Sequence, residues 1–307
     1  MTHYPISPLI TILGPTASGK TKLAVKLANL FDGEIISADS RQVYQGMDIG
    51  TGKDIDEYKS IPYHLIDIIS PHNEYNLFNF ATDFSQAFKE ITARQKIPLL
   101  VGGTGMYLDA VLSRYTLTIA NIDKNTRQTL EKKTESELRA ILKLIKPDQH
   151  NTTDILSKER LVRAIEIANA ELRNEQTFSW PEFDELILGI RVSRQELKKR
   201  IASRLKARFE AGMVEEVEML LKRGISSSRI DNFGLEYRYI LKYINGEINY
   251  NDMFQKLESA IVNFSKQQEK WFRNFEKKGK NIIWLDFESP MTDSAMQTIK
   301  RYLNQFT

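Results

Sequence analysis

A lysine and a threonine at the end of a glycine-bearing loop are the residues of this chain best suited to chemistry. Together with the residues before them they fill the spacing G-x-x-x-x-G-K-[ST], here Gly14, Pro15, Thr16, Ala17, Ser18, Gly19, Lys20 and Thr21. In such a loop the backbone N–H groups converge on phosphate oxygens, the lysine neutralises charge, and the hydroxyl can hold Mg²⁺. We therefore expect this P-loop to bind a di- or triphosphate, with Thr21 as a ligand of Mg²⁺.

Three further polar residues come where apolar runs that predict strands end, namely Asp39, Asp67 and Thr104. The carboxyl ends of parallel strands meet at one edge of a sheet, so we expect these residues to line one crevice with the P-loop. For Asp39, a metal ligand and a general base both remain open. Thr104 either only shapes its turn or hydrogen-bonds a phosphate or leaving-group oxygen. Asp67 either caps its strand or is a rival metal ligand.

The order of apolar patterns predicts the elements that must hold these residues. Strand patterns occupy 9–13, 34–38, 63–68, 97–101, 186–190 and 282–285. Helical patterns alternate with the first of them, which indicates a parallel sheet. We predict an α/β fold in which residues 1–115 and 186–307 form a P-loop-containing core, a parallel sheet flanked by helices. A mostly helical insertion is expected at 116–185.

After the insertion, residues 193–222 predict one long helix. Arg200, Arg204 and Arg208 recur along it at i, i+4 and so share one face. Such a stripe is usually a solvated face, but facing the crevice it could bind phosphate, because a guanidinium can hold a phosphate with two hydrogen bonds.

The composition is that of an ordinary globular protein. Hydrophobic residues make up 41% and charged residues 27% of the 307 residues, and no apolar run is long enough to span a membrane. The absence of cysteine excludes disulfides, thiolate metal sites and cysteine catalysis, and favours a cytoplasmic location. A net charge of +3 is too small to establish a nucleic-acid partner by itself.

Taken together, the motifs resemble the tRNA dimethylallyltransferases, also called tRNA isopentenyltransferases. The resemblance spans nearly the whole chain and is most specific in the N-terminal part. It rests on the P-loop and on segments 37–44, 46–53, 61–67 and 100–107, with weaker matches at 160–166, 200–201 and 212–217.

The resemblance implies transfer of a dimethylallyl group from dimethylallyl diphosphate to N6 of an adenosine in tRNA, with Mg²⁺ as cofactor. The adenosine lies next to the anticodon on its 3′ side, in tRNAs that read codons beginning with U. Asp39 would take the proton from N6, and Thr104 would bind the bridging oxygen. Lys20 and Arg204 would offset charge on the departing diphosphate, which the P-loop holds.

The same resemblance implies an RNA partner, the anticodon stem-loop, and we expect the enzyme to be a monomer. Residues expected to contact RNA near the crevice are Asp39, Ser40, Arg41, Gln42 and Thr104. Those expected to contact it from the insertion are Lys158, Glu159, Arg160 and Arg163.

Departures from the family pattern gather late in the chain. Glu236 stands where the family commonly has a basic residue, and residues 261–263 replace its Thr-Arg-Gln. Both segments belong to the family's tRNA-contacting side, so we expect altered RNA recognition. The alternative is that Glu236 faces solvent or pairs with Arg238 or Lys242.

Three other functions stay open at this point. A P-loop small-molecule or nucleotide kinase needs a triphosphate donor and usually an arginine-bearing lid, which the insertion could imitate. A prenyltransferase acting on free adenine nucleotides would resemble the same family, although such enzymes are shorter. A non-catalytic RNA-binding module is disfavoured by the intact P-loop, Asp39 and Thr104.

Overall fold

The computed structural model describes residues 6–118, 124–147, 157–173 and 176–306. The chain divides into two compact units, one formed by Met1–Ser113 with Pro181–Thr307 and the other by Arg114–Trp180. None of the helices in the described ranges combines the length and apolarity that crossing a bilayer requires.

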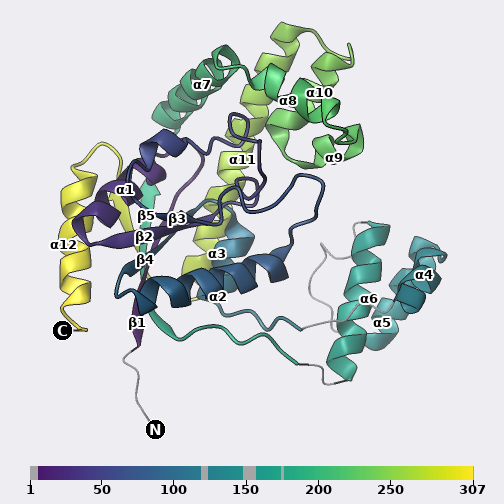
Figure 1. The fold of residues 1–307 in the computed structure, drawn as a ribbon, viewed down its shortest axis with the longest axis horizontal. Coiled ribbons are helices and arrows are strands. Elements are labelled where there is room, and N and C mark those ends of the chain that lie inside the picture. Colours follow the sequence, from purple (N-terminus) through teal and green to yellow (C-terminus); the bar gives the residue numbers. More distant parts are fainter. Residues whose placement is uncertain (1–5, 119–123, 148–156, 174–175, 307) are drawn as a thin grey trace. The chain divides into compact units, whose positions relative to one another are not determined.

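The first unit is built on one parallel six-stranded sheet, as expected for the α/β class (Figure 1). The strands are β1 (Ser7–Leu13), β2 (Gly33–Ala38), β3 (Tyr63–His64), β4 (Ile97–Gly102), β5 (Phe183–Arg191) and β6 (Ile282–Asp286). Their order is β3-β2-β4-β1-β5-β6, so the strand that precedes the P-loop lies inside the sheet between β4 and β5. Strands covered on both faces need continuous apolar runs, which is what the sequence of β1 and β4 supplies.

Two strands differ from their predicted bounds by three residues or more at one end. β5 begins at Phe183, earlier than the predicted start at residue 186. β3 covers only Tyr63–His64 instead of 63–68, because Leu65 (φ 65°) and Asp67 (φ 57°) adopt left-handed backbone conformations that a strand cannot contain.

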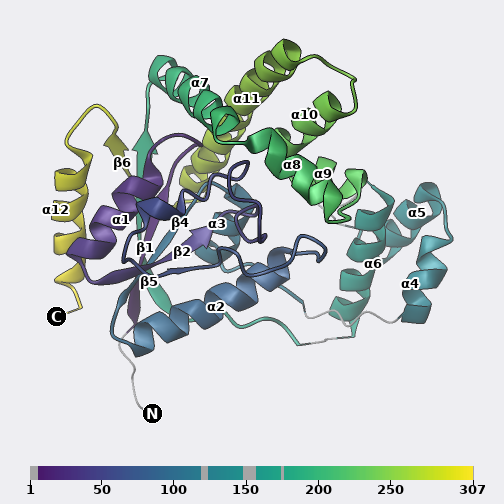
Figure 2. The ribbon, with the colours of Figure 1, turned by 45° about the horizontal axis from the view of Figure 1, so that its top comes forward.

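Helices cover both faces of the sheet (Figure 2). They are α1 (Lys20–Leu30), α2 (Leu77–Ala93), α3 (Gly105–Leu112) and α12 (Met291–Leu303), with a 3₁₀ turn, η1 (Ile55–Glu57), after β2. α1 packs beside α12 and α2 beside α3, and right-handed crossovers place α1 and α2 on opposite faces. α2 shows why the sequence is helical there: Asn76 caps its first turn, and Phe80, Phe84 and Phe88 form its buried stripe.

Residues 193–222 form two helices, so the prediction of one long helix was wrong. α7 (Arg194–Glu210) ends before Gly212, whose φ of 96° turns the chain into α8 (Met213–Lys222). The remaining helices of this unit are α9 (Ser227–Asn232), α10 (Leu235–Ile244) and α11 (Tyr250–Lys277). α11 contacts α3, α7 and α10, and therefore ties the late helices to the sheet layer.

The second unit is helical in the part that the structure describes. It contains α4 (Lys124–Glu131), α5 (Glu135–Ile145) and α6 (Lys158–Leu172). Leu138 and Leu142 of α5 pack with Leu161 and Ile165 of α6 in a small apolar core of its own. Thr134 caps α5 by accepting from the backbone N–H of Glu137, so this helix has a defined start.

Candidate active site

The P-loop joins β1 to α1 in a conformation suited to phosphate. Ala17 (φ 61°) and Gly19 (φ 89°) adopt left-handed backbone, and alternation of this kind turns successive N–H groups toward one point. Arg200 of α7 donates from Nε to the main-chain oxygen of Ala17 at 2.6 Å. One arginine of the predicted stripe therefore supports the loop itself.

A pocket of about 460 Å³ opens at the carboxyl ends of β2 and β4 beside the P-loop. It brings together residues proposed from the sequence as one site: Thr16, Lys20, Thr21, Asp39, Ser40, Arg41, Gln42, Thr104 and Arg204. The other P-loop residues are not part of its lining, and Pro15 lines a neighbouring cavity instead.

Asp39 and Thr104 come from adjacent strand ends and are linked through backbone. Asp39 Oδ1 accepts from the N–H of Arg41 at 2.9 Å, which fixes the carboxylate at the start of the turn. Thr104 Oγ1 accepts from the N–H of Ser40 at 3.1 Å. Because the hydroxyl oxygen is the acceptor in that bond, its proton remains available to a third group in the pocket.

Five cationic residues line the pocket, and three of them, Lys20, Arg204 and Arg208, influence one another's charge. Burial lowers the pKa of Lys20 to about 8, Asp39 opposes the shift, and Arg204 and Arg208 add to it. Burial and the charge of Arg204 lower the pKa of Arg208 to about 10. Crowded cations of this kind favour a multiply charged anion as ligand. Arg208 was not among the site residues expected from the sequence, although the i, i+4 stripe contained it.

Gly52 lies directly against two of these arginines. Its main-chain oxygen accepts from Gln42 Nε2 at 3.1 Å and from Arg204 Nη2 at 3.3 Å. A Cβ at this position would fall 1.4 Å from Arg208 Nη2 and 2.3 Å from Arg204 Nη2, and the φ of 61° also favours glycine. The loop 46–53 can approach the cations this closely only because residue 52 has no side chain.

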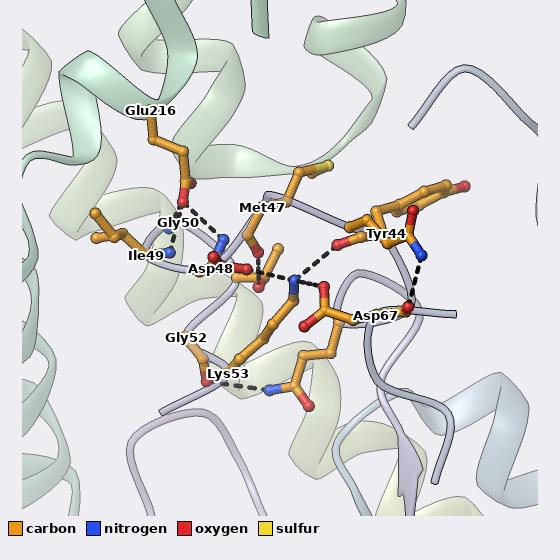
Figure 3. Close-up of polar contacts among 12 residues, drawn as sticks. Tyr44, Met47, Asp48, Ile49, Gly50, Gly52, Lys53, Asp67 and Glu216 are labelled. Atoms are coloured by element: carbon orange, nitrogen blue, oxygen red, sulfur yellow. Dashed lines mark hydrogen bonds and ion pairs between the residues drawn. The ribbon is translucent and has the colours of Figure 1, made fainter. Parts of the chain in front are cut away.

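The buried carboxylate of Glu216 on α8 holds the same loop in place (Figure 3). Its Oε2 accepts from the N–H groups of Asp48 and Ile49, both at 2.7 Å, and its Oε1 accepts from Gly50 N–H at 3.0 Å. Tyr237 completes the set by donating its hydroxyl to Oε1 at 2.8 Å. The motif match at 212–217 contained Glu216, but no local pattern predicted what it binds.

Asp67 does not line the pocket, and its carboxylate lies against Lys53 instead (Figure 3). Its carboxylate pairs with Lys53, whose side chain is completely buried. Lys53 Nζ also donates to Tyr44 O at 2.7 Å and to Asp48 Oδ1 at 2.6 Å. The expectation that Asp67 lines the crevice was wrong because its partner is a buried lysine that the sequence did not single out.

Gln268 of α11 joins the two phosphate-facing loops. Its Oε1 accepts from the N–H of Thr16 at 2.8 Å, and its Nε2 donates to the main-chain oxygen of Gly103 at 2.9 Å. The side chain is buried, so these bonds are shielded from water. One amide therefore sets the spacing between the P-loop and the loop that carries Thr104.

Glu236 lines the pocket, which corrects the expectation that it faces solvent or pairs with Arg238 or Lys242. Its carboxylate lies 3.7 Å from Arg208 Nη1, not beside Arg238 or Lys242, and its side chain is 21% exposed. Burial raises its pKa, although Arg208 opposes the shift. Arg238 pairs instead with Asp231 at 3.2 Å.

Part of the pocket lining is apolar. It includes Met106, Ile261, Phe264 and Trp271, and Ile261 belongs to the segment that departs from the family pattern. The Trp271 ring packs on Gly105, where a Cβ would fall 2.4 Å from the ring. The pocket therefore offers both cationic and apolar groups to a ligand.

The residues present fit a magnesium ion that is held largely by its substrate. Thr21 and Asp39 face the pocket, and the described residues contain no group of three or more acidic or histidine side chains placed to hold a metal. Mg²⁺ is commonly bound by one or two protein oxygens together with substrate phosphates and water. A hydroxyl and one carboxylate beside a phosphate cradle satisfy that requirement.

The RNA-contacting residues expected in the insertion stand on the first turns of α6. Lys158 follows the cap Ser157, Glu159 and Arg160 are exposed, and Arg163 donates to Glu166 Oε2 at 3.0 Å. They belong to the second unit, separately from the pocket of the first.

Known proteins of one family match this chain over nearly its full length. The IPP transferase family model matches residues 42–275, and the isopentenyl transferase model matches residues 8–60. The chain is 51% identical to tRNA dimethylallyltransferase 1 of Geotalea uraniireducens, covering 95% of this chain and 97% of the relative. It is 50% identical to tRNA dimethylallyltransferase 2 of Citrifermentans bemidjiense, covering 98% and 97%.

Solved structures agree with the fold. The full-length tRNA isopentenylpyrophosphate transferase of Bacillus halodurans is similar with a TM-score of 0.71 and 30% identity, covering 98% of this chain and 96% of that one. A eukaryotic dimethylallyltransferase, solved acting on tRNA, has a TM-score of 0.75 at 22% identity, covering 97% of this chain and 78% of that one. The second likeness concerns the fold alone.

Proposed function

The chain belongs to the tRNA dimethylallyltransferase (IPP transferase) family, and from this premise we propose which of its residues carry out the transfer. The enzyme moves a dimethylallyl group from dimethylallyl diphosphate to N6 of the adenosine on the 3′ side of the anticodon, in tRNAs that read codons beginning with U. The kinase, free-nucleotide and non-catalytic alternatives lose their support, because relatives named tRNA dimethylallyltransferase match over nearly the whole chain.

The reaction forms one N–C bond and breaks one C–O bond. The N6 lone pair attacks C1 of the dimethylallyl group, and the electron pair of the C1–O bond departs with diphosphate. Asp39 takes the proton that N6 loses, with Oδ1 held by Arg41 N–H and Oδ2 receiving the proton. Thr104 donates its free hydroxyl proton to the bridging oxygen as negative charge develops there.

The cationic wall receives the leaving group. The P-loop N–H groups and Lys20 bind diphosphate oxygens, and Arg204 and Arg208 neutralise charge that grows as the C1–O bond breaks. Thr21 would hold Mg²⁺, which when bound supplies further charge stabilisation to the diphosphate. The apolar wall of Ile261, Phe264 and Trp271 then suits the dimethylallyl carbons.

The RNA is held from two parts of the chain in this proposal. Ser40, Arg41 and Gln42 contact the target nucleotide, which must leave its stack to reach a pocket of this kind. The exposed start of α6, with Lys158, Glu159, Arg160 and Arg163, contacts the anticodon stem-loop from the insertion. We also expect a monomer that works in the cytoplasm, in keeping with the cysteine-free sequence.

The observation that carries the proposal is the convergence of Asp39, Thr104, Lys20 and Arg204 on one pocket. Asp39→Asn tests it, because an amide cannot take the proton while the P-loop stays intact. We expect a loss of roughly 10²–10⁴-fold in the rate of transfer to an anticodon stem-loop RNA, with dimethylallyl diphosphate affinity nearly unchanged.

The matched control is Asp56→Asn, which removes an exposed carboxylate from η1 outside the pocket. Mass spectrometry of the digested RNA identifies the modified nucleoside. Near-normal turnover by Asp39→Asn would remove this aspartate from the mechanism.

A further inference from the structure

A second cavity, of about 380 Å³, adjoins the active-site pocket. The two cavities share Arg41 and Asn232, so these residues form a common wall. The rest of the second cavity comes chiefly from α9 and its flanks, with Ser226, Ser228 and Arg229 as its polar groups. None of these three has a role in the reaction described above.

The second cavity contains two guanidinium groups whose charge no carboxylate neutralises among the described residues. Arg229 donates to the main-chain oxygens of Pro71 and Asn73, which are neutral acceptors, and lies 5.2 Å from the centre of the Phe233 ring. Arg41 uses its backbone N–H for Asp39, and its guanidinium has no hydrogen bond or ion pair within the described ranges. The cavity is therefore electropositive.

Its other polar groups include the amide of Asn232, which donates to the main-chain oxygen of Ser228 at 2.9 Å, and two serine hydroxyls that can donate. Ser226 Oγ and Ser228 Oγ lie 3.2 Å apart, and Ser226 Oγ accepts weakly from Arg229 N–H at 3.3 Å. Two guanidinium groups and two hydroxyls together suit the oxygens of a phosphate. The aromatic residues of the cavity, Tyr44 and Phe233, are buried, so they offer no open ring face for a base to stack on.

We propose that this cavity, lined by Arg41, Ser226, Ser228 and Arg229, binds a backbone phosphate adjacent to the target adenosine. The inference rests on the proposed function, because it needs an RNA base in the active-site pocket. A strand whose base enters that pocket carries its neighbouring phosphate past the wall of Arg41 and Asn232. A phosphate held there fixes which nucleotide reaches Asp39, since backbone contacts set the register of a nucleic acid.

The test combines protein variants with neutralised phosphates. An anticodon stem-loop RNA carries a methylphosphonate at one or the other phosphate that flanks the target adenosine. RNA affinity is measured for wild type, Arg229→Gln and Ser228→Ala, with Lys222→Gln as a control that removes an exposed cation of α8 outside both cavities. Thermal unfolding of each variant monitors the loss of the bonds that Arg229 makes to 71 and 73. Ser228→Ala leaves those bonds in place.

We expect Arg229→Gln to weaken RNA binding roughly tenfold, as removal of a charge-assisted bond does. The slope of log affinity against log salt should shrink by about 0.7 to 1. Ser228→Ala should weaken binding a few-fold, and dimethylallyl diphosphate affinity should not change. One methylphosphonate should cost wild type at least as much as the arginine change does. It should cost Arg229→Gln clearly less than it costs wild type, because only Arg41 and the two hydroxyls then lose a charged partner.

Equal methylphosphonate penalties in wild type and Arg229→Gln would overturn the inference, as would a wild type that tolerates both methylphosphonates. Failure of the proposed function looks different. In that case wild type would not modify the unaltered RNA at all, whatever Arg229→Gln binds.

Discussion

Replacing Glu216 should show how strongly the active-site loop depends on one buried carboxylate. The side chain accepts four hydrogen bonds, three from consecutive backbone N–H groups at 48–50 and one from Tyr237. Glu216→Ala removes all four acceptors, and Glu216→Gln replaces one oxygen by an NH₂ that must face donors. Tyr237→Phe removes only the hydroxyl bond.

The magnitudes follow from the number of donors left unpaired. A hydrogen bond to a charged group contributes about 1.5–3 kcal/mol, and a buried donor without a partner costs about 1–3 kcal/mol. The bonds share one acceptor group and are not additive, so we expect about 3–5 kcal/mol of lost stability for Glu216→Ala. Glu216→Gln should lose about 2–4 kcal/mol and Tyr237→Phe about 1–2 kcal/mol.

Urea unfolding at neutral pH followed by circular dichroism measures these differences as shifts in midpoint at constant slope. The control is Glu215→Gln, which makes the same chemical change one residue away at an exposed position of α8. Because the 46–53 loop also positions the main-chain oxygen of Gly52 against Arg204, the folded Glu216→Gln protein should bind dimethylallyl diphosphate about tenfold more weakly. A Glu216→Gln protein within about 0.5 kcal/mol of the Glu215→Gln protein would refute this account of the loop.

Further predictions concern the pocket. Lys20 should lose its proton in the free enzyme as pH rises through about 8. The enzyme's affinity for dimethylallyl diphosphate should therefore fall above that pH, by at most about tenfold per pH unit. Calorimetry should find this fall in the wild type and no such step in Lys20→Arg. Gln268→Ala should lower the transfer rate about 10–100-fold by loosening both catalytic loops. Glu269→Ala, at a half-buried position outside the pocket, should not, and equal kinetics of the two variants would contradict the bridging role. Glu236→Gln should tighten dimethylallyl diphosphate binding several-fold, because the Glu236 carboxylate competes with the diphosphate for Arg208. Weaker binding by this variant would mean that the carboxylate instead holds Arg208 in place.

The sequence predicted what is local in this site. The P-loop spacing, the polar residues after apolar runs and the alternation of strands with helices were enough to bring Asp39 and Thr104 to one edge of a parallel sheet. These predictions succeed because the carboxyl ends of parallel strands must lie together. They need no knowledge of which distant side chain touches which.

The contacts that the sequence did not predict join residues far apart in the chain. Glu216 serves N–H groups more than 160 residues before it, and Gln268 accepts from Thr16 across 252 positions. A backbone donor has no side-chain identity, so nothing in the sequence marks which carboxylate it will find. Glu236 was misplaced for a related reason: its partner Arg208 lies on a helix whose orientation depends on the break at Gly212.

The amide of Gln268 also couples the position of α11 to the positions of the two active-site loops. With 28 residues in regular helix, α11 is about 42 Å long. One side chain is hydrogen-bonded to both the P-loop and the Gly103 loop. A displacement of α11 would therefore move both loops together and keep the distance between them unchanged. Glutamate would lack the donor and lysine would lack the acceptor, so of these three residues only glutamine can transmit motion to the two loops equally.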